Sequence, residues 1–361
     1  MKSIPKYARV REVISQQIKS GELSPGDKLL SEEEYAKLHG VSTITVRKAL
    51  ADLVTEGLIV RTKSKGTFVR EPQEDQSASK LVALILSPED YYDISYMQII
   101  KGAQRMMADN EYSLIVEWGD KDFESERATI LKMIDRQVDG FLIYPFDPVQ
   151  SRENYRLIKD AGIPYVQIDR YDIDASDYFV GCNNYEGGML ATRKLLELGH
   201  RSICFGAYQF FLSSELERYD GFCSAMRQAG IELAHSHLLN GIDYDTLRDQ
   251  ILAGEVTALF CCNDKLAVKA VRQLMERGIR IPEDVSVMGF DDWEGNRDIP
   301  MGLTTMRQDF AALGQMAAHL LINVINGNTV SNLKMLVGVT LVERDTVSEY
   351  QGNKVYHRQE S

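Results

Sequence analysis

Two adjacent carboxylates occupy a position where a ligand rich in hydroxyl groups could bind. Asp291 and Asp292 follow an apolar run at 285–290 that contains Gly289, a residue that frees the backbone to turn. An ionised carboxylate accepts hydrogen bonds and donates none, and parallel sheets bind ligands just past the carboxyl ends of their strands. The same two residues could instead cap the next segment as turn residues, and this window alone leaves both interpretations open.

Polar side chains also follow other apolar runs. Asp169 and Arg170 end the run at 165–169, Asn263 follows 256–262, and Arg218 comes four residues after Ser214 near the start of a helical pattern. If they converge, these groups form a ring of donors and acceptors for a polyhydroxylated ligand. The alternative is that each polar residue caps the following helix, and for Asn263 and its neighbour Asp264 both interpretations remain open.

The elements that must position these groups alternate regularly from residue 81 onward. Near-continuous apolar strands separated by amphipathic helices predict parallel sheets covered on both faces. About 280 residues exceed one such sheet, so we expect two similar α/β lobes with a cleft where their strand ends meet. The expected strands are 81–86, 113–118, 140–145, 165–169, 178–182, 202–207, 256–262 and 285–290, and the expected helices include 95–109, 125–136, 185–198, 214–229 and 264–277.

The first 70 residues have a different pattern, which predicts a winged helix-turn-helix of the α+β class. A helix at 6–19 is followed by a second helix that opens with the capping box Ser31 and Glu34 and ends at Gly40. Ser42 caps a third helix, and two short β runs follow at 58–61 and 66–69. The expected buried positions are Tyr7, Val10, Val13, Ile14 and Ile18 on the first helix and Val46, Leu50, Leu53 and Val54 on the third.

Charge separates the same two regions. The total net charge is −12, yet the first 70 residues carry a net +5, so the remainder is strongly acidic. A small basic module on an acidic body suggests that only the basic module meets a polyanion. The five cysteines show no metal-ligand spacing, and His235 and His237 stand as a lone HxH, so we expect neither a metal site nor a cofactor. No apolar run is long enough for a membrane span, and the first residues are unlike a signal peptide, which favours the cytoplasm.

The first 70 residues contain the words GELSPGDKL, SEEEYAKLHGVS, TVRKALADLVTEGLI and GTFV. These closely resemble the DNA-binding domain of the GntR family, in which the third helix enters the major groove. Family members usually carry Arg where this chain has Glu33 and Thr43, which implies an operator that departs from the usual consensus. A merely solvated basic face at Arg47 and Lys48 is the alternative. By this resemblance the residues facing DNA are Ser42, Thr43, Thr45, Arg47 and Lys48 on the helix and Lys63, Lys65, Gly66 and Thr67 on the wing.

The remainder contains the words LLELGHRSICF, ERYDGF, CNDKLAVKAVRQLMERGIRIPEDVSVMGFDD and LTTMRQD. These resemble the effector domain of LacI/GalR regulators, which shares its fold with periplasmic sugar-binding proteins. Arg170 beside Asp169 is similar to the pair in pentose-binding members, so a pentose such as arabinose is favoured. By this resemblance the ligand contacts are Tyr91, Tyr92, Asp169, Arg170, Ser214, Arg218, Tyr244, Asn263, Asp291 and Gln308, with the tyrosines packing against sugar C–H groups.

Together these features predict a transcription regulator, most simply a homodimeric repressor that binds operator DNA and is released by a small sugar. The expected domains are a winged helix at 1–70, a linker at 71–80, an effector domain at 81–345 and a C-terminal tail at 346–361. A purine, a nucleoside or a protein co-effector is the alternative to sugar. An enzyme acting on sugars is disfavoured, because no nucleophile motif or phosphate-binding GxxxxGK[ST] is present.

Overall fold

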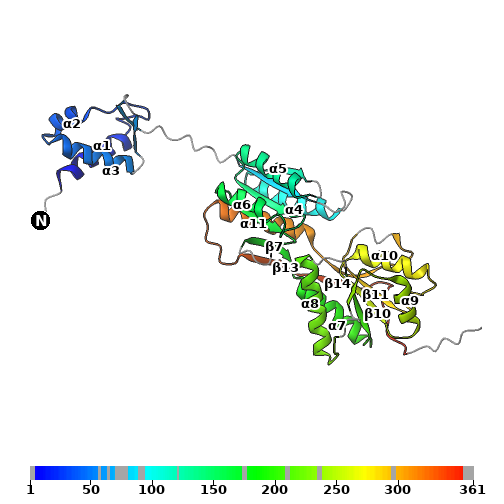
Figure 1. The fold of residues 1–361 in the computed structure, drawn as a ribbon. Coiled ribbons are helices and arrows are strands. Elements are labelled where there is room, and N and C mark those ends of the chain that lie inside the picture. Colours follow the sequence, from blue (N-terminus) through cyan, green and yellow to red (C-terminus); the bar gives the residue numbers. More distant parts are fainter. Residues whose placement is uncertain are drawn as a thin grey trace, which may run out of the picture. The chain divides into compact units, whose positions relative to one another are not determined.

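The computed structural model describes residues 5–55, 58–62, 66–69, 80–87, 94–119, 122–172, 177–207, 212–233, 238–293 and 298–352. The chain divides into two compact units, residues 1–78 and 79–361 (Figure 1). The predicted linker falls, except for Lys80, outside the described residues. Within the described ranges, no helix has the length and apolar character that crossing a membrane requires.

The first unit is a small helical domain with a two-stranded sheet. Its helices are α1 (Lys6–Lys19), α2 (Glu32–His39) and α3 (Thr43–Thr55), and antiparallel strands β1 (Ile59–Thr62) and β2 (Gly66–Val69) follow. Lys28 forms an isolated antiparallel bridge with Phe68, so the segment before α2 is tied to β2. This is the predicted winged helix-turn-helix order.

Local capping sets the ends of the helices that form the helix-turn-helix. The backbone N–H of Glu34 donates to Ser31 Oγ, and the Glu34 carboxylate accepts from the Ser31 N–H at 2.7 Å, which completes the predicted capping box. Gly40 ends α2 in the left-handed region with φ 62°. Thr45 N–H donates to Ser42 Oγ at 3.3 Å, so Ser42 caps α3 as expected.

The core of this unit is narrower than the sequence predicted. Ile14 on α1 and Leu53 on α3 are buried, whereas their neighbours Val13 and Val54 are 36% and 37% exposed. Successive residues point about 100° apart on a helix, and Val13 and Val54 lie at the edge of the buried stripe of their helices.

The second unit contains two six-stranded sheets, which we call the first and second lobes. The first-lobe sheet is wholly parallel and the second-lobe sheet is parallel except for β14, as near-continuous apolar strands predicted. In the first lobe the strand order is β13 (Lys334–Val337), β7 (Tyr178–Cys182), β6 (Tyr165–Ile168), β5 (Gly140–Tyr144), β3 (Leu81–Leu86) and β4 (Ser113–Trp118). In the second lobe it is β14 (Thr340–Val342), β12 (Thr304–Arg307), β11 (Ser286–Asp291), β10 (Ala258–Cys261), β8 (Ile203–Ala207) and β9 (Leu238–Asn240).

Eight helices lie within the described residues of this unit, four in each lobe. In the first lobe, two helices pack on one face of the sheet and two on the other. The first-lobe helices are α4 (Ile94–Asp109) and α11 (Phe310–Ile325) on one face, and α5 (Phe123–Asp135) and α6 (Arg152–Asp160) on the other. The second-lobe helices are α7 (Asn184–Glu197), α8 (Ser213–Gln228), α9 (Tyr244–Leu252) and α10 (Asp264–Met275) (Figure 1).

The chain passes between the lobes three times: after β7, after β12 and after β13. Helix α11 therefore packs in the first lobe although it follows a strand of the second lobe. The sequence did not single out α6, α9 or α11, nor strands β9, β12, β13 and β14. The strands are only three or four residues long, and α11 is apolar around most of its circumference, so neither shows a clear periodicity.

The second lobe also includes residues beyond 345. Thr346 is buried, and its carbonyl accepts a hydrogen bond from the Val287 N–H at 2.8 Å. The Tyr350 N–H donates to the Leu198 carbonyl at the same distance. The packed part of the chain therefore extends into the region that the sequence suggested was a tail.

Glycines allow the backbones of two helix pairs to touch. A Cβ on Gly102 of α4 would lie 2.0 Å from the Ala311 carbonyl oxygen of α11, and one on Gly314 would lie 2.0 Å from the Ile99 carbonyl oxygen. The α7–α8 pair repeats this arrangement, because a Cβ on Gly188 would lie 2.2 Å from the Arg218 carbonyl oxygen. The lack of side chains at these crossings sets the position of Arg218 relative to α7.

We predict that Gly102→Ala destabilises the protein although alanine normally favours a helix by about 1 kcal/mol. The added methyl group meets a backbone oxygen that cannot move alone, so we expect the free energy of unfolding to fall by about 1–3 kcal/mol. Chemical denaturation of the full chain measures this. Gly338→Ala is the control, because a Cβ there meets no atom within 4 Å. A stabilised Gly102→Ala variant would contradict the close crossing.

Candidate functional site

A cavity of about 60 Å³ lies where carboxyl ends of strands from the two lobes meet. Seven of the ten residues that the sequence predicted as ligand contacts line it, three from outside the second lobe and four from within it. They are Asp169, Arg170, Gln308, Ser214, Arg218, Asn263 and Asp291. Residues separated by more than 130 positions in the sequence are therefore brought to one site.

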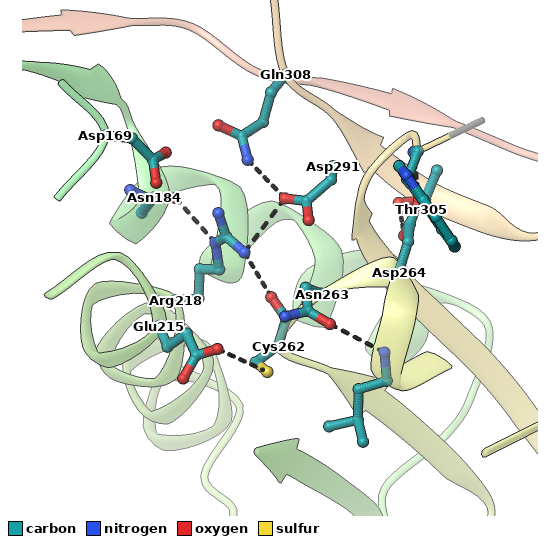
Figure 2. Close-up of polar contacts among 12 residues, drawn as sticks. Asp169, Asn184, Glu215, Arg218, Cys262, Asn263, Asp264, Asp291, Thr305 and Gln308 are labelled. Atoms are coloured by element: carbon teal, nitrogen blue, oxygen red, sulfur yellow. Dashed lines mark hydrogen bonds and ion pairs between the residues drawn. The ribbon is translucent and has the colours of Figure 1, made fainter. Parts of the chain in front are cut away.

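Arg218, in the middle of α8, is the centre of the polar network in this cavity (Figure 2). Its Nε donates to Asn184 Oδ1 at 2.9 Å, and its Nη1 donates to the Cys262 carbonyl at 2.6 Å. Nη1 also lies 3.3 Å from Asp291 Oδ1, and the guanidinium stacks on the Phe290 ring with its Cζ 3.9 Å from the centroid. Three segments of the second lobe thus hold one buried cation in place.

The charge of Arg218 is maintained by the acids around it. Burial alone would lower the pKa of the Arg218 guanidinium, but the negative charges of Asp291 and Asp169 outweigh it and the pKa is raised. A buried, permanently charged guanidinium with fixed orientation is a strong donor for hydroxyl or carboxylate oxygens. The cavity therefore presents a cation that does not depend on pH in the physiological range.

Asp291 completes the second-lobe wall beside Arg218. Gln308 Nε2 donates to Asp291 Oδ1 at 2.5 Å, and the Gln308 N–H donates to the Asp291 carbonyl at 3.3 Å. Burial raises the pKa of Asp291, the positive charge of Arg218 opposes this rise, and the negative charge of nearby Asp264 adds to it. Since Gln308 lies at the passage from β12 to α11, the crossover itself holds this carboxylate.

The sequence suggested that Gly289 makes the turn after β11. In the structure, Asp291 and Asp292 make it instead. Asp291 has φ 121° and Asp292 has φ 57°, whereas Gly289 lies inside the strand. Non-glycine residues in this region are strained, and such strain is often found at functional sites. Gly289 serves a different purpose, because a Cβ there would lie 2.1 Å from Asp264 Oδ1.

Asp264 stabilises the strained turn formed by Asp291 and Asp292. It is fully buried, and it accepts hydrogen bonds from Thr305 Oγ1 at 2.6 Å and from the Trp293 N–H at 2.8 Å. Asp264 thus ties the start of α10 to β12 and to the residue after the turn. Absence of a side chain at Gly289 makes this approach possible.

Asp292 has a different role from its neighbour Asp291. Its two carboxylate oxygens accept from Arg307 Nε and from Arg344 Nη2, both at 2.7 Å. Both oxygens are therefore engaged in ion pairs directed away from the cavity, which Asp292 does not line. Of the two acids, only Asp291 is available to a ligand.

Asn263 has both of the positions that the sequence left open, because it caps a helix and also lines the cavity. Its Oδ1 accepts from the Leu266 N–H at 2.9 Å and so caps α10. The same side chain lines the cavity, and its Nδ2 group can donate there. The cap fixes which end of the amide is offered to a ligand.

The first-lobe wall is built on Asp169 and Arg170. Tyr144 Oη donates to Asp169 Oδ2 at 2.9 Å, and Arg170 Nε lies 3.7 Å from the same oxygen. The Arg170 guanidinium lies over the Tyr144 ring, with its Cζ 5.2 Å from the centroid. Asp169 has φ 67°, so a strained aspartate ends a strand in each lobe.

Sequence reasoning missed seven residues that line the cavity. Tyr144 ends β5, so the strand-end argument that located Asp169 would have found it. Glu215 and Lys265 adjoin Ser214 and Asp264, which were singled out, and Phe310 starts the helix that was not identified. The complete set of missed residues is Ser95, Tyr96, Tyr144, Leu212, Glu215, Lys265 and Phe310.

Of the three tyrosines predicted to pack against a ligand, the structure describes only Tyr244, and Tyr244 does not line the cavity. Tyr91 and Tyr92 lie outside the described residues. Tyr244 starts α9 and is buried in the core of the second lobe, where its ring lies under the Arg277 guanidinium at 5.9 Å. Packing in this apolar core holds the ring inside the lobe, and Tyr244 does not line the cavity.

A direct contact joins the lobes beside the cavity. Tyr171 follows Arg170 in the first lobe, and its N–H donates to Ser213 Oγ of α8 at 3.0 Å. Its hydroxyl donates to Glu217 Oε1, one turn further along α8, at 2.6 Å. Burial and the Glu217 acceptor both raise the pKa of Tyr171, so its hydroxyl remains a donor.

In the first unit, Arg47 and Arg61 converge on one carboxylate. Arg47 Nε and Nη2 each lie 2.9 Å from Glu32 Oε2, and Arg61 Nη2 lies 3.0 Å from Glu32 Oε1. The hydrogen bond that Arg47 donates to Glu32 raises the pKa of Arg47, and the two arginines lower the pKa of Glu32. Arg47 nevertheless remains exposed on α3, with a side chain that is 65% accessible.

The other residues predicted to face DNA lie on α3 and the wing. Lys48 Nζ lies 4.0 Å from the centre of the Tyr7 ring, and Ser42 and Thr45 share a side-chain hydrogen bond of 2.9 Å. Gly66 has φ 123°, and Thr67 follows it in β2. Thr43 is the first residue of α3, whereas Lys63 and Lys65 lie outside the described residues.

Two protein-family models match separate parts of the chain, one in the basic first 70 residues and one in the acidic remainder. The model for the GntR family of bacterial regulatory proteins matches residues 6–69. The model for the periplasmic binding protein-like domain matches residues 192–347.

Two curated relatives match almost the entire length. The arabinose metabolism transcriptional repressor of Geobacillus stearothermophilus is 29% identical over 96% of this chain and 99% of its own length. The protein of the same name from Halalkalibacterium halodurans is 30% identical over 89% of each chain. A solved complex of the transcriptional regulator CelR with cellobiose has a TM-score of 0.66 and 23% identity, and it covers 88% of this chain and all of the solved chain.

We predict that Tyr171→Phe loosens the contact between the lobes, since it removes one hydrogen bond worth about 1 kcal/mol. Hydrogen–deuterium exchange should show faster exchange of the Tyr171 amide and of the first turn of α8. Tyr178→Phe is the control, because it removes a hydroxyl from the same lobe but leaves the Tyr171 contact intact. Unchanged exchange in Tyr171→Phe would mean that this hydrogen bond does not hold the lobes together.

Proposed function

The chain belongs to the GntR family of bacterial transcription regulators, in the group of the arabinose metabolism repressors, and we propose that a small sugar bound between its two lobes controls its affinity for operator DNA. It is a DNA-binding regulator with a periplasmic-binding-protein-like domain, and its relatives are regulators and not enzymes. The proposal adds the residues that bind each partner and the class of effector.

DNA is bound, in this proposal, by the exposed face of α3 and by the wing. Arg47 supplies a guanidinium that can pair with two acceptors of guanine, and Ser42, Thr43, Thr45 and Lys48 surround it. The wing residues Lys63, Lys65, Gly66 and Thr67 would lie along the phosphates. The observation that supports this assignment is the exposure of Arg47 on a helix whose opposite face is buried.

The effector binds among the residues around Arg218. The observation that supports this effector site is the buried guanidinium of Arg218, which is fixed between Asp291 and Asp169. The guanidinium supplies hydrogen-bond donors, and the two carboxylates beside it supply acceptors. Sugar hydroxyls both donate and accept, so they can satisfy such a ring without leaving a buried charge unpaired. Tyr96 and Tyr144 replace Tyr244 as the aromatic surface for sugar C–H groups.

A pentose is the favoured sugar. Arg170 adjoins Asp169 on the first-lobe wall, and the two relatives are named for arabinose metabolism. A purine or nucleoside is the alternative effector to be tested.

Two copies would act together on a palindromic operator in the cytoplasm, each winged helix reading one half-site. A sugar that binds one arrangement of the lobes more tightly than the other shifts the population toward it and changes operator affinity. Tyr171 lies at the contact that must rearrange when the lobes move.

We expect Arg47→Ala to weaken operator binding roughly 10-fold to 100-fold, the usual value of a good arginine–guanine pair. Sugar affinity should remain unchanged, because Arg47 belongs to the other compact unit. Fluorescence anisotropy at fixed salt gives the first quantity and calorimetry the second. Arg9→Ala removes an equal charge from α1, and the DNA affinity that this variant loses should be the same for operator DNA and for unrelated DNA. If Arg47→Ala shows the same lack of selectivity, Arg47 does not read a base.

We expect Arg218→Met to abolish the response to sugar while sparing DNA binding, since it keeps the apolar contact with Phe290 but removes every donor. A thermal-shift screen of pentoses, hexoses, nucleosides and purines tests this. An effector at 100 times its Kd stabilises the wild type by about 2.7 kcal/mol. Asp169→Asn, in the other lobe, should lose the same response.

Arg193→Met is the matched control, because Arg193 lies on the neighbouring helix α7 and bonds Gln228 at the surface. It should retain the shift in full. A shift that persists in both Arg218→Met and Asp169→Asn would place the effector elsewhere. A response to purines together with silence toward every sugar would overturn the sugar proposal.

A further inference from the structure

The most exposed large apolar side chain among the described residues is Ile44, which is 76% accessible. It is the second residue of α3, between Thr43 and Thr45. Single exposed apolar residues are common on protein surfaces, so exposure alone decides nothing. The position of Ile44 on its helix is what makes it informative.

Ile44 shares a face with the basic side chains of α3. Arg47 and Lys48 follow it at three and four residues, which places all three on one side of the helix. The opposite side is buried in the core of the unit through Val46, Ala49, Leu50 and Leu53. Ile44 therefore lies on the surface that a polyanion would cover, in the first turn, where recognition helices contact base edges.

The cap and first turn of α3 present the hydroxyls of Ser42, Thr43 and Thr45 and the exposed hydrocarbon side chain of Ile44, and no guanidinium. Ser42 and Thr45 already share a hydrogen bond, and Arg47 is held by Glu32. Ile44 is thus the exposed side chain of this turn that cannot form a hydrogen bond, and it is the most accessible large apolar side chain among the described residues of the unit.

The major groove offers one apolar group to such a side chain, the C5-methyl of thymine. We propose that Ile44 is a specificity-determining residue that selects a thymine in each operator half-site by packing against this methyl group. Contact between the two removes apolar surface of both from water, whereas cytosine leaves the isoleucine facing a bare ring edge. The inference rests on the proposed function, because it requires α3 to lie in the major groove.

The test begins with operator duplexes that the full-length protein selects from a random pool. Each thymine of a half-site is then replaced in turn by deoxyuridine, which lacks only the C5-methyl group and keeps its base pairing. At one thymine per half-site, we expect the wild-type Kd to rise roughly threefold to tenfold, the range for one or two buried methyl groups.

Variants of Ile44 connect that thymine to this residue. Ile44→Ala should bind the thymine and deoxyuridine duplexes equally, and Ile44→Val, which keeps a branched side chain, should retain most of the difference. Leu38→Ala is the matched control, since Leu38 is also exposed, at 65%, but lies on α2. It should preserve the wild-type ratio between the two duplexes.

The outcomes separate this inference from the proposed function. Failure of the wild type to select any duplex would overturn both. Selection of an operator with no thymine sensitive to loss of its methyl group would overturn the role of Ile44 alone. The same follows if Ile44→Ala keeps the wild-type ratio. Circular dichroism melting of each variant confirms that α3 is folded, and the deoxyuridine scan of the wild type stands independently of any variant.

Discussion

The effector domain depends on the buried guanidinium of Arg218. A charge removed from water is tolerated only where acceptors surround it, and here they come from α7, from the end of β10 and from the end of β11. Each of those segments must be held in place for the network to exist. The glycine crossing of α7 and α8 sets the distance to Asn184, and Asp264 holds the turn that carries Asp291. Much of the second lobe therefore serves to position one cation.

The same network explains the strain at this site. Asp169 and Asp291 adopt backbone conformations that glycine would adopt more easily, yet glycine could offer no carboxylate. Burial also raises the pKa of Asp291, so ionising it costs free energy in the absence of a ligand. Hydroxyl groups that donate to these acids would relieve part of that cost. Backbone strain of this kind is often found at sites that change state on binding.

The DNA-binding unit follows a similar principle on its surface. Glu32 pairs with Arg47 of α3 and Arg61 of β1 through one carboxylate, so two guanidinium groups from separate elements are held in fixed positions on this surface. Preorganisation of this kind reduces the entropy lost on binding. The two partners are thus served by separate compact units, and the chemistry of each is local to its unit.

The sequence by itself determined what depends on local patterns. Capping residues, the period of apolar residues and the polar residues at strand ends identified the winged helix, the alternating lobes and the lining residues Asp169, Arg170, Asn263 and Asp291, because these are short-range signals. Gln308 was identified only through the resemblance to a known family. Only the tertiary structure decided the rest. Tyr244 was predicted to face a ligand, but packing buries it in the core of the second lobe, whereas Tyr144, which the sequence did not single out, lines the cavity and donates to Asp169. Asp291 and Asp292 are adjacent and chemically identical, and only Arg307 and Arg344, brought by β12 and by the segment after β14, distinguish them. Such roles are set by long-range contacts, which no local pattern in the sequence encodes.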